Sequence, residues 1–154
     1  MNRRHFLLGL PAAMVALNAR AHHGWSSFDE TRPYYFAGEV VALRWQNPHA
    51  EVELKVAGDL AEPPEVARLQ APAQQASVDG ARILAGAQPA PRAGVWTCEL
   101  APLTRIAAWN VPQPAVGDRI AVVGYLRPEA TELRTRAEFV LIGGRVYPLR
   151  SLPA

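Results

Sequence analysis

Apolar and polar residues alternate with a period of two along several stretches of this chain, and this alternation predicts β-strands. The clearest stretch is residues 49–56, in which Val52, Leu54 and Val56 share one parity and three charged residues take the other. Six strands are predicted in this way, at residues 35–46, 49–56, 94–100, 119–126, 132–142 and 145–149. In such strands one face packs on a core and the other meets solvent.

The first strand is expected to change register along its length. Val41, Leu43 and Trp45 share one parity, whereas Phe36 takes the other and Gly38 lies between them. A glycine at such a position indicates a β-bulge. Tight turns are predicted at three pairs of residues, Asn47-Pro48, Gly117-Asp118 and Gly143-Gly144.

Residues 57–94 interrupt the alternation with many alanines and several prolines. We expect an inserted loop with two weak helices, at 65–69 and 78–84, that makes few contacts with the core. Residues 102–110 fit one short helix.

Three strands, a short helix and then further strands is the element order of an OB-fold barrel. The predicted fold class is therefore all-β: a small OB-like barrel of five to six strands, with one short helix between strands three and four. The barrel domain occupies residues 35–150, including the insertion at 57–94, and residues 22–34 form an extended N-terminal arm. A β-sandwich is the main alternative.

The first 21 residues predict a cleavable export signal. Arg3 and Arg4 supply positive charge, an apolar run follows at 6–17, and residues 19–21 (Ala-Arg-Ala) have the small-x-small pattern of a cleavage site. The run is too short to cross a bilayer, and no second apolar span follows, so we expect no membrane span in the mature chain. The arginine pair also fits a twin-arginine signal loosely, so both the Sec and the Tat routes to the periplasm stay open.

Charge and cysteine content exclude two classes of protein for the mature chain. Three of the 16 basic residues lie in the export signal, and the rest are outnumbered by the 14 acidic residues. Nucleic-acid binding needs clustered Lys and Arg, which this balance does not supply. Cys98 is the only cysteine, which excludes a disulfide scaffold, and its inward parity predicts an inert buried thiol.

The histidines that remain after cleavage lie in two places, His22-His23 and His49. Cleavage after Ala21 would free the α-amine of His22, and an amine with its own imidazole forms a chelate. With His49 or His23 as a further nitrogen, this metal site suits Cu(II) better than zinc. An α-amine pKa of about 7.7–8 lets a metal displace the amine proton near neutral pH. Glu51 shares the parity of His49 and is its expected carboxylate partner. The alternative is that all three histidines are structural.

Other notable residues are expected to be structural. Trp45 and Trp96 have core parity, and Trp25 is expected to fasten the arm to the barrel. The charged residues of the last two strands are expected to form a solvated stripe: Arg134, Arg136, Arg145, Glu132 and Glu138. No Gly-x-Ser-x-Gly, His-Glu-x-x-His, Cys-x-x-Cys or phosphate-binding glycine motif is present, so we predict no enzyme and assign no catalytic residue.

The segments His22-His23-Gly24-Trp25, Phe28-Asp29 and Trp45-Gln46-Asn47-Pro48-His49 resemble a family of small exported bacterial proteins, domain of unknown function 6152. The resemblance extends over most of the mature length, and the insertion at 57–94 departs from it. It implies export and a small β-barrel, and it supplies no activity.

Three hypotheses about function remain. The first is a periplasmic copper-binding protein that uses the mature N-terminus. The second is a non-catalytic binding or assembly module for another periplasmic protein, which predicts an exposed apolar patch and no converging histidines. The third and least supported is an enzyme with dispersed residues, which requires a pocket that holds perturbed acids such as Asp29 or Glu99.

Overall fold

The computed structural model describes residues 24–58, 65–129 and 131–154. The elements in these ranges are η1 (Trp25–Ser27), β1 (Tyr34–Arg44), β2 (Glu51–Val56), η2 (Val66–Arg68), α1 (Gly80–Ala85), β3 (Gln88–Pro89), β4 (Gly94–Glu99), α2 (Leu103–Ala108), β5 (Arg119–Tyr125), β6 (Arg134–Ile142) and β7 (Arg145–Pro148). The predicted export signal lies outside the described residues. In the described part of the chain, no helix is long and apolar enough to cross a membrane.

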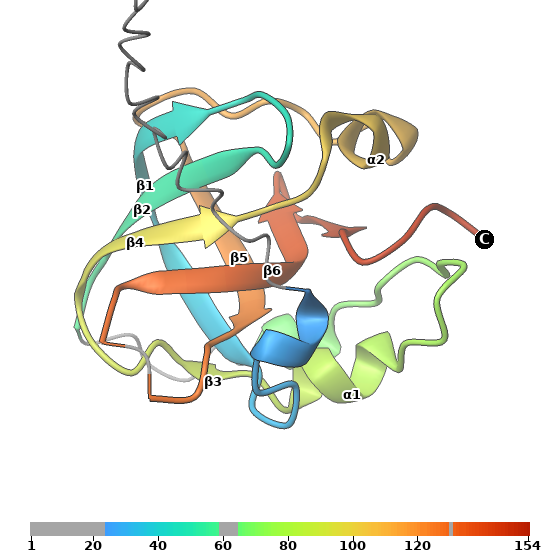
Figure 1. The fold of residues 1–154 in the computed structure, drawn as a ribbon, viewed down its shortest axis with the longest axis horizontal. Helices are drawn as coiled ribbons and strands as arrows, with labels where there is room; N and C mark the ends of the chain where they lie inside the picture. Colours follow the sequence, from blue (N-terminus) through green and yellow to red (C-terminus); the bar gives the residue numbers. More distant parts are fainter. Residues whose placement is uncertain (1–23, 59–64, 130) are drawn as a thin grey trace, which may run out of the picture.

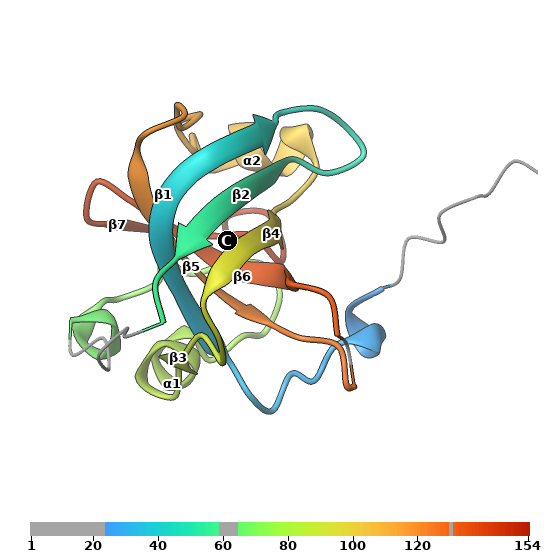
Figure 2. The ribbon, with the colours of Figure 1, turned by 90° about the vertical axis from the view of Figure 1, so that its left-hand side faces the viewer.

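Five of the strands close into a barrel, as predicted. They follow the order β2-β4-β6-β5-β1, and pairing of β1 with β2 completes the ring. β4 and β6 pair in parallel and the other neighbours are antiparallel, which is the strand order of an OB-fold. Figures 1 and 2 show α2, which connects β4 to β5, at one end of the barrel and α1 at the opposite end. The short strands β3 and β7 pair with β1 and β6 outside the ring.

The first strand bends so that it can serve two neighbours. Gly38 pairs with Val56 on one side and Ile120 on the other, and a Cβ there would collide with the main-chain oxygen of Lys55. The register shift falls between Val40 and Ala42, so the bulge lies beyond the glycine where it was predicted. This shift explains the change of parity along the strand.

The barrel interior is apolar and fully buried. Phe36 packs on Trp96 with ring centroids 4.7 Å apart, and both side chains are buried. Trp45 is partly buried against the same core. Cys98 is buried as predicted, and burial raises the pKa of its thiol. Packing of this interior core fixes the relative positions of the strands, and with them the positions of the side chains on the outer face of the barrel.

A second core lies on the outside of the barrel and corrects the prediction for the insertion. Val66 and Leu84 of the insertion are buried with Val123 and Phe139, which point outward from β5 and β6. These two strands are apolar on both faces, so their outer face needs a cover. The insertion is that cover, and the expectation that it makes few core contacts was wrong.

Candidate functional site

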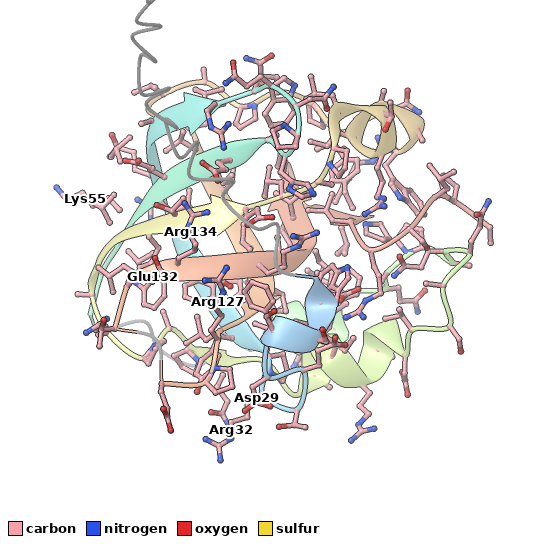
Figure 3. The ribbon with its side chains drawn as sticks, in the orientation of Figure 1. Asp29, Arg32, Lys55, Arg127, Glu132 and Arg134 are labelled. Atoms are coloured by element: carbon pink, nitrogen blue, oxygen red, sulfur yellow. The ribbon has the colours of Figure 1, made fainter. Side chains whose placement is uncertain are left out.

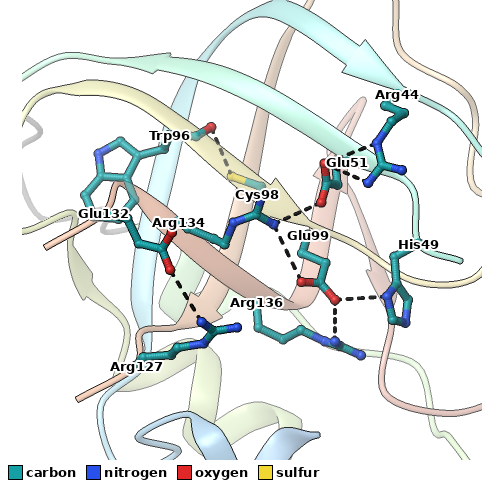
Figure 4. Close-up of polar contacts among 10 residues, drawn as sticks. All are labelled: Arg44, His49, Glu51, Trp96, Cys98, Glu99, Arg127, Glu132, Arg134 and Arg136. Carbon is teal, nitrogen blue, oxygen red and sulfur yellow. Dashed lines mark hydrogen bonds and ion pairs between the residues drawn. The ribbon is translucent and has the colours of Figure 1, made fainter. Parts of the chain in front are cut away.

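Charged side chains gather on the outer face of β2, β4 and β6, at the opposite side of the sheet from the interior core. We call this group the ionic cluster; its members are Arg44, His49, Glu51, Glu99, Arg134 and Arg136 (Figure 4). Alternation along β6 places Arg134 and Arg136 there, with the buried Thr135 between them, and the pairing of β2 with β4 places Glu51 beside Glu99.

Two carboxylates lie directly opposite each other in the ionic cluster. Glu51 on β2 is in register with Glu99 on β4, and like charges in such pairs destabilise a sheet unless cations compensate them. Arg134 reaches both, with its Nη1 2.9 Å from Glu51 and 3.7 Å from Glu99. Arg44 lies 2.9 Å from Glu51, and Arg136 binds Glu99. The arginines therefore hold both carboxylates in fixed positions.

The pKa values in the ionic cluster reflect a balance between burial and the attraction of opposite charges. Partial burial alone would raise the pKa of Glu51, but hydrogen bonds from Arg134 and Arg44 outweigh it and the pKa is lowered. Burial likewise opposes ionisation of Arg134, whereas Glu51 and Glu99 raise its pKa above the ordinary value. Both groups are therefore charged at neutral pH.

His49 lies at the edge of the ionic cluster, in the connection from β1 to β2. Its backbone position is fixed on both sides: the Asn47 side chain accepts a hydrogen bond from Leu103 N at 3.1 Å, and Ala50 N donates to Ala101 at 2.9 Å. The His49 side chain is 15% exposed, and its Nδ1 lies 3.0 Å from Glu99 Oε1.

Glu99 is therefore a carboxylate partner of His49. With Glu51 in register with Glu99, His49 lies diagonally across the antiparallel pair from Glu99, within reach of a long side chain. The contact with Glu99 was not expected, because the expectation of Glu51 considered positions along one strand only. The alternation of β4 indicates that the Glu99 side chain points outward, and this was the available signal for its role. Its contact with His49 depends on the pairing of β2 with β4, which joins residues far apart in the chain.

The N-terminal arm is fastened to the barrel next to this cluster. Trp25 of η1 stacks on two guanidinium groups, with its ring centroid 4.0 Å from Arg150 Cζ and 4.9 Å from Arg136 Cζ. Its ring also meets Tyr125 edge-on at 6.4 Å. Cation–π contacts of this kind are worth about 0.5–2 kcal/mol each. Trp25 thus fastens the arm, as predicted, at the guanidinium that also binds Glu99.

The expected solvated stripe on the last strands is partly buried, which corrects that prediction. Arg136 is 6% exposed and Glu138 is fully buried. Arg150 donates to both oxygens of Glu138 and also pairs with Glu30 of the arm. Burial raises the pKa of Glu138 despite these bonds. The arm and the C-terminal segment cover these side chains, which strand parity alone does not reveal.

Of the three histidines expected to bind a metal, the structure describes only His49. His22 and His23 lie outside the described residues. Within residues 24–58, 65–129 and 131–154, no three His, Cys, Asp or Glu side chains are placed to hold a metal ion. The other two expected ligands, His22 and His23, come directly before Gly24, where the described arm begins.

Comparison with protein families gives one match. A family model described as a family of unknown function (DUF6152) matches residues 11–69, in agreement with the resemblance drawn from the sequence. Comparisons with curated proteins and with solved structures give no significant match. The family description assigns no activity, so a functional proposal depends on the site itself.

Proposed function

We propose that this chain is an exported periplasmic protein that binds Cu(II) through its processed N-terminus, with His22, His23 and His49 as ligands. The observation that carries the proposal is a chain of contacts from the arm to His49. Trp25 lies on Arg136, Arg136 binds Glu99, and Glu99 contacts the His49 ring. The arm is therefore anchored close to the one histidine of the barrel.

The N-terminal histidines are close in sequence to the Trp25 anchor. Only three residues, His22, His23 and Gly24, precede Trp25 after cleavage at Ala21. Extended backbone spans at most about 3.3–3.6 Å per residue, so the terminal amine stays within about 10 Å of the Trp25 backbone. An arm anchored at Trp25 restricts the positions that the amine and the two imidazoles can reach, which would lower the entropy lost if they converge with His49 on one ion.

The contact with Glu99 also suits His49 as a ligand. Metal-binding histidines commonly donate one ring N–H to a carboxylate, which fixes the ring and makes the other nitrogen more basic. In His49 the contact with the carboxylate is made by Nδ1, 3.0 Å from Glu99 Oε1. An amine and two or three imidazoles form a nitrogen-rich set, which Cu(II) prefers in a planar arrangement.

The alternative function, a binding module for another periplasmic protein, has less support. It predicts an exposed apolar patch. In the described part of the chain, the large exposed apolar side chains are Val95, Val116 and Leu152, which belong to β4, the loop before β5 and the C-terminal segment.

The position of the cleavage site is the first property to determine. We expect intact-mass analysis of the exported protein to give a chain that begins at His22, since Ala19 and Ala21 are the small pair correctly placed after the apolar run. A retained signal, or a start beyond His23, would remove the amine chelate from the proposal.

Glu99→Gln tests the role of the carboxylate beside His49. Loss of such a partner typically lowers metal affinity about 10–100-fold, and we expect a loss of this size in a Cu(II) titration. Glu53→Gln is the matched control, because Glu53 is on the same face of β2 and outside the ionic cluster. Equal affinities for the two variants, at equal melting temperatures, would show that Glu99 has no part in copper binding.

A further inference from the structure

The N-terminal arm is held on the barrel by contacts at separate points. The Phe28 side chain is buried, and Asp29 N donates to Leu126 O at 2.8 Å, where Figure 3 shows Asp29 below Arg127. Beyond these contacts, a cavity of about 470 Å³ lies between the arm and α1. A segment held at separate points and bordered by a cavity can leave the surface while the barrel stays folded.

One guanidinium joins the arm to a buried carboxylate. Arg150 Nη2 lies 2.8 Å from Glu30 Oε2 of the arm, and the same nitrogen contacts Oε2 of Glu138 on β6. Arg150 Nε adds contacts of 2.9 Å to Oε2 and 3.2 Å to Oε1 of Glu138. Glu138 is fully buried, whereas the Glu30 side chain is 39% exposed. Two carboxylates therefore share one cation, and the buried one makes more of the contacts.

The groups around Glu138 do not balance the charge of the two carboxylates. The charged and titratable side chains come from each element packed against it: Arg150, Glu30, Tyr125 of β5 and Arg136 of its own strand. Burial raises the pKa of Tyr125, so its hydroxyl stays neutral. Arg136 already binds Glu99, and the insertion contributes a hydrogen bond from the uncharged Gln74. One negative charge is left over when both carboxylates are ionised.

This surplus charge couples Glu138 to the arm. Burial raises the pKa of Glu138, Arg150 opposes the increase, and the negative charge of Glu30 adds to it. The arm carries Glu30, so docking of the arm makes Glu138 hold a proton more tightly. By linkage, a proton on Glu138 favours the docked arm, and this effect is lost as the pH rises through the pKa of Glu138 in the docked state.

We infer that the N-terminal arm is a proton-sensitive strap, which binds the barrel more tightly when Glu138 takes up a proton from solvent. Oε1 of Glu138 takes this proton, because its contact with Arg150 is the longer one. The neutral acid competes less for Arg150 Nη2, so Arg150 binds Glu30 of the arm more strongly. The inference does not depend on the copper proposal, because it involves none of the copper ligands.

Hydrogen exchange of the Asp29 amide, measured by NMR on the exported protein without added copper, tests the inference. This N–H donates to Leu126 O when the arm is docked, so its protection factor reports docking. We expect the protection factor, corrected for the intrinsic rate at each pH, to be at least about threefold larger at about pH 5 than at about pH 7.5. An unchanged or smaller protection factor at the lower pH would overturn the inference.

Variants assign the proton to Glu138. Glu138→Gln, which is neutral at every pH, is expected to abolish the pH dependence of the protection factor. Glu30→Gln, at a partly exposed position of the arm, is expected to remove most of it and gives the same test if Glu138→Gln does not fold. Two controls are expected to keep the full pH dependence: His49→Ala, which removes the titrating ring beside Glu99, and Glu53→Gln on β2. A pH dependence that persists in Glu30→Gln, or that disappears in His49→Ala, would overturn the inference.

Discussion

Replacing residues 65–89 with a short Gly-Asn turn is expected to destabilise the protein by about 3–6 kcal/mol, because it removes the buried Val66 and Leu84 side chains. It also exposes Phe139 and Val123 on the outer face of β5 and β6. Most small domains are stable by only about 5–15 kcal/mol, so we expect a large drop in melting temperature and poor expression. Thermal unfolding monitored by circular dichroism measures this directly.

Point variants separate loss of packing from any other effect of the replacement. Leu84→Ala alone should cost about 2–5 kcal/mol, as is usual for a buried leucine. Arg68→Ala, at an exposed position of η2 in the same segment, should change the stability by no more than about 0.5 kcal/mol. A melting temperature that survives both the replacement and Leu84→Ala would show that the second core does not hold the barrel together.

Adding three alanines before His22 is expected to lower the affinity for Cu(II) at least tenfold, about 1.4 kcal/mol or more. The extra residues move the terminal amine away from both the His22 and the His23 imidazoles and break the chelate, although every histidine remains. Two fusion proteins whose cleavage leaves either His22 or Ala-Ala-Ala-His22 at the N-terminus provide a matched pair. Equal affinities in a competition titration against a copper chelator would contradict a role for the amine.

The barrel was predictable because its strands carry their own signals. The alternation of apolar and polar residues predicted the strands, and the Asn-Pro and Gly-Gly turns marked where they end. The short helix between β4 and β5 distinguished the element order of an OB-fold from that of other barrels. The role of Trp25 could also be predicted. A large aromatic side chain in an otherwise polar arm is stabilised when it packs against the barrel, so it was expected to fasten the arm.

The parts that sequence analysis missed all depend on neighbours distant in the chain. Glu99 meets His49 only because β2 and β4 pair in one register, and Glu138 is buried only because Arg150 and the arm cover it. The composition of the insertion, which is rich in alanine and proline, suggested that it buries little apolar surface. The continuous apolar runs of β5 and β6 were the signal that something must cover their outer face.

The electron paramagnetic resonance spectrum of the Cu(II)-loaded exported protein, recorded beside that of His49→Ala, tests the central claim most directly. We predict one tightly bound Cu(II) with nitrogen-dominated coupling in the natural protein. In His49→Ala we predict weaker binding and a spectrum that reports fewer nitrogen ligands. Identical spectra and affinities for the two proteins would contradict the account, because copper would then bind without the barrel histidine.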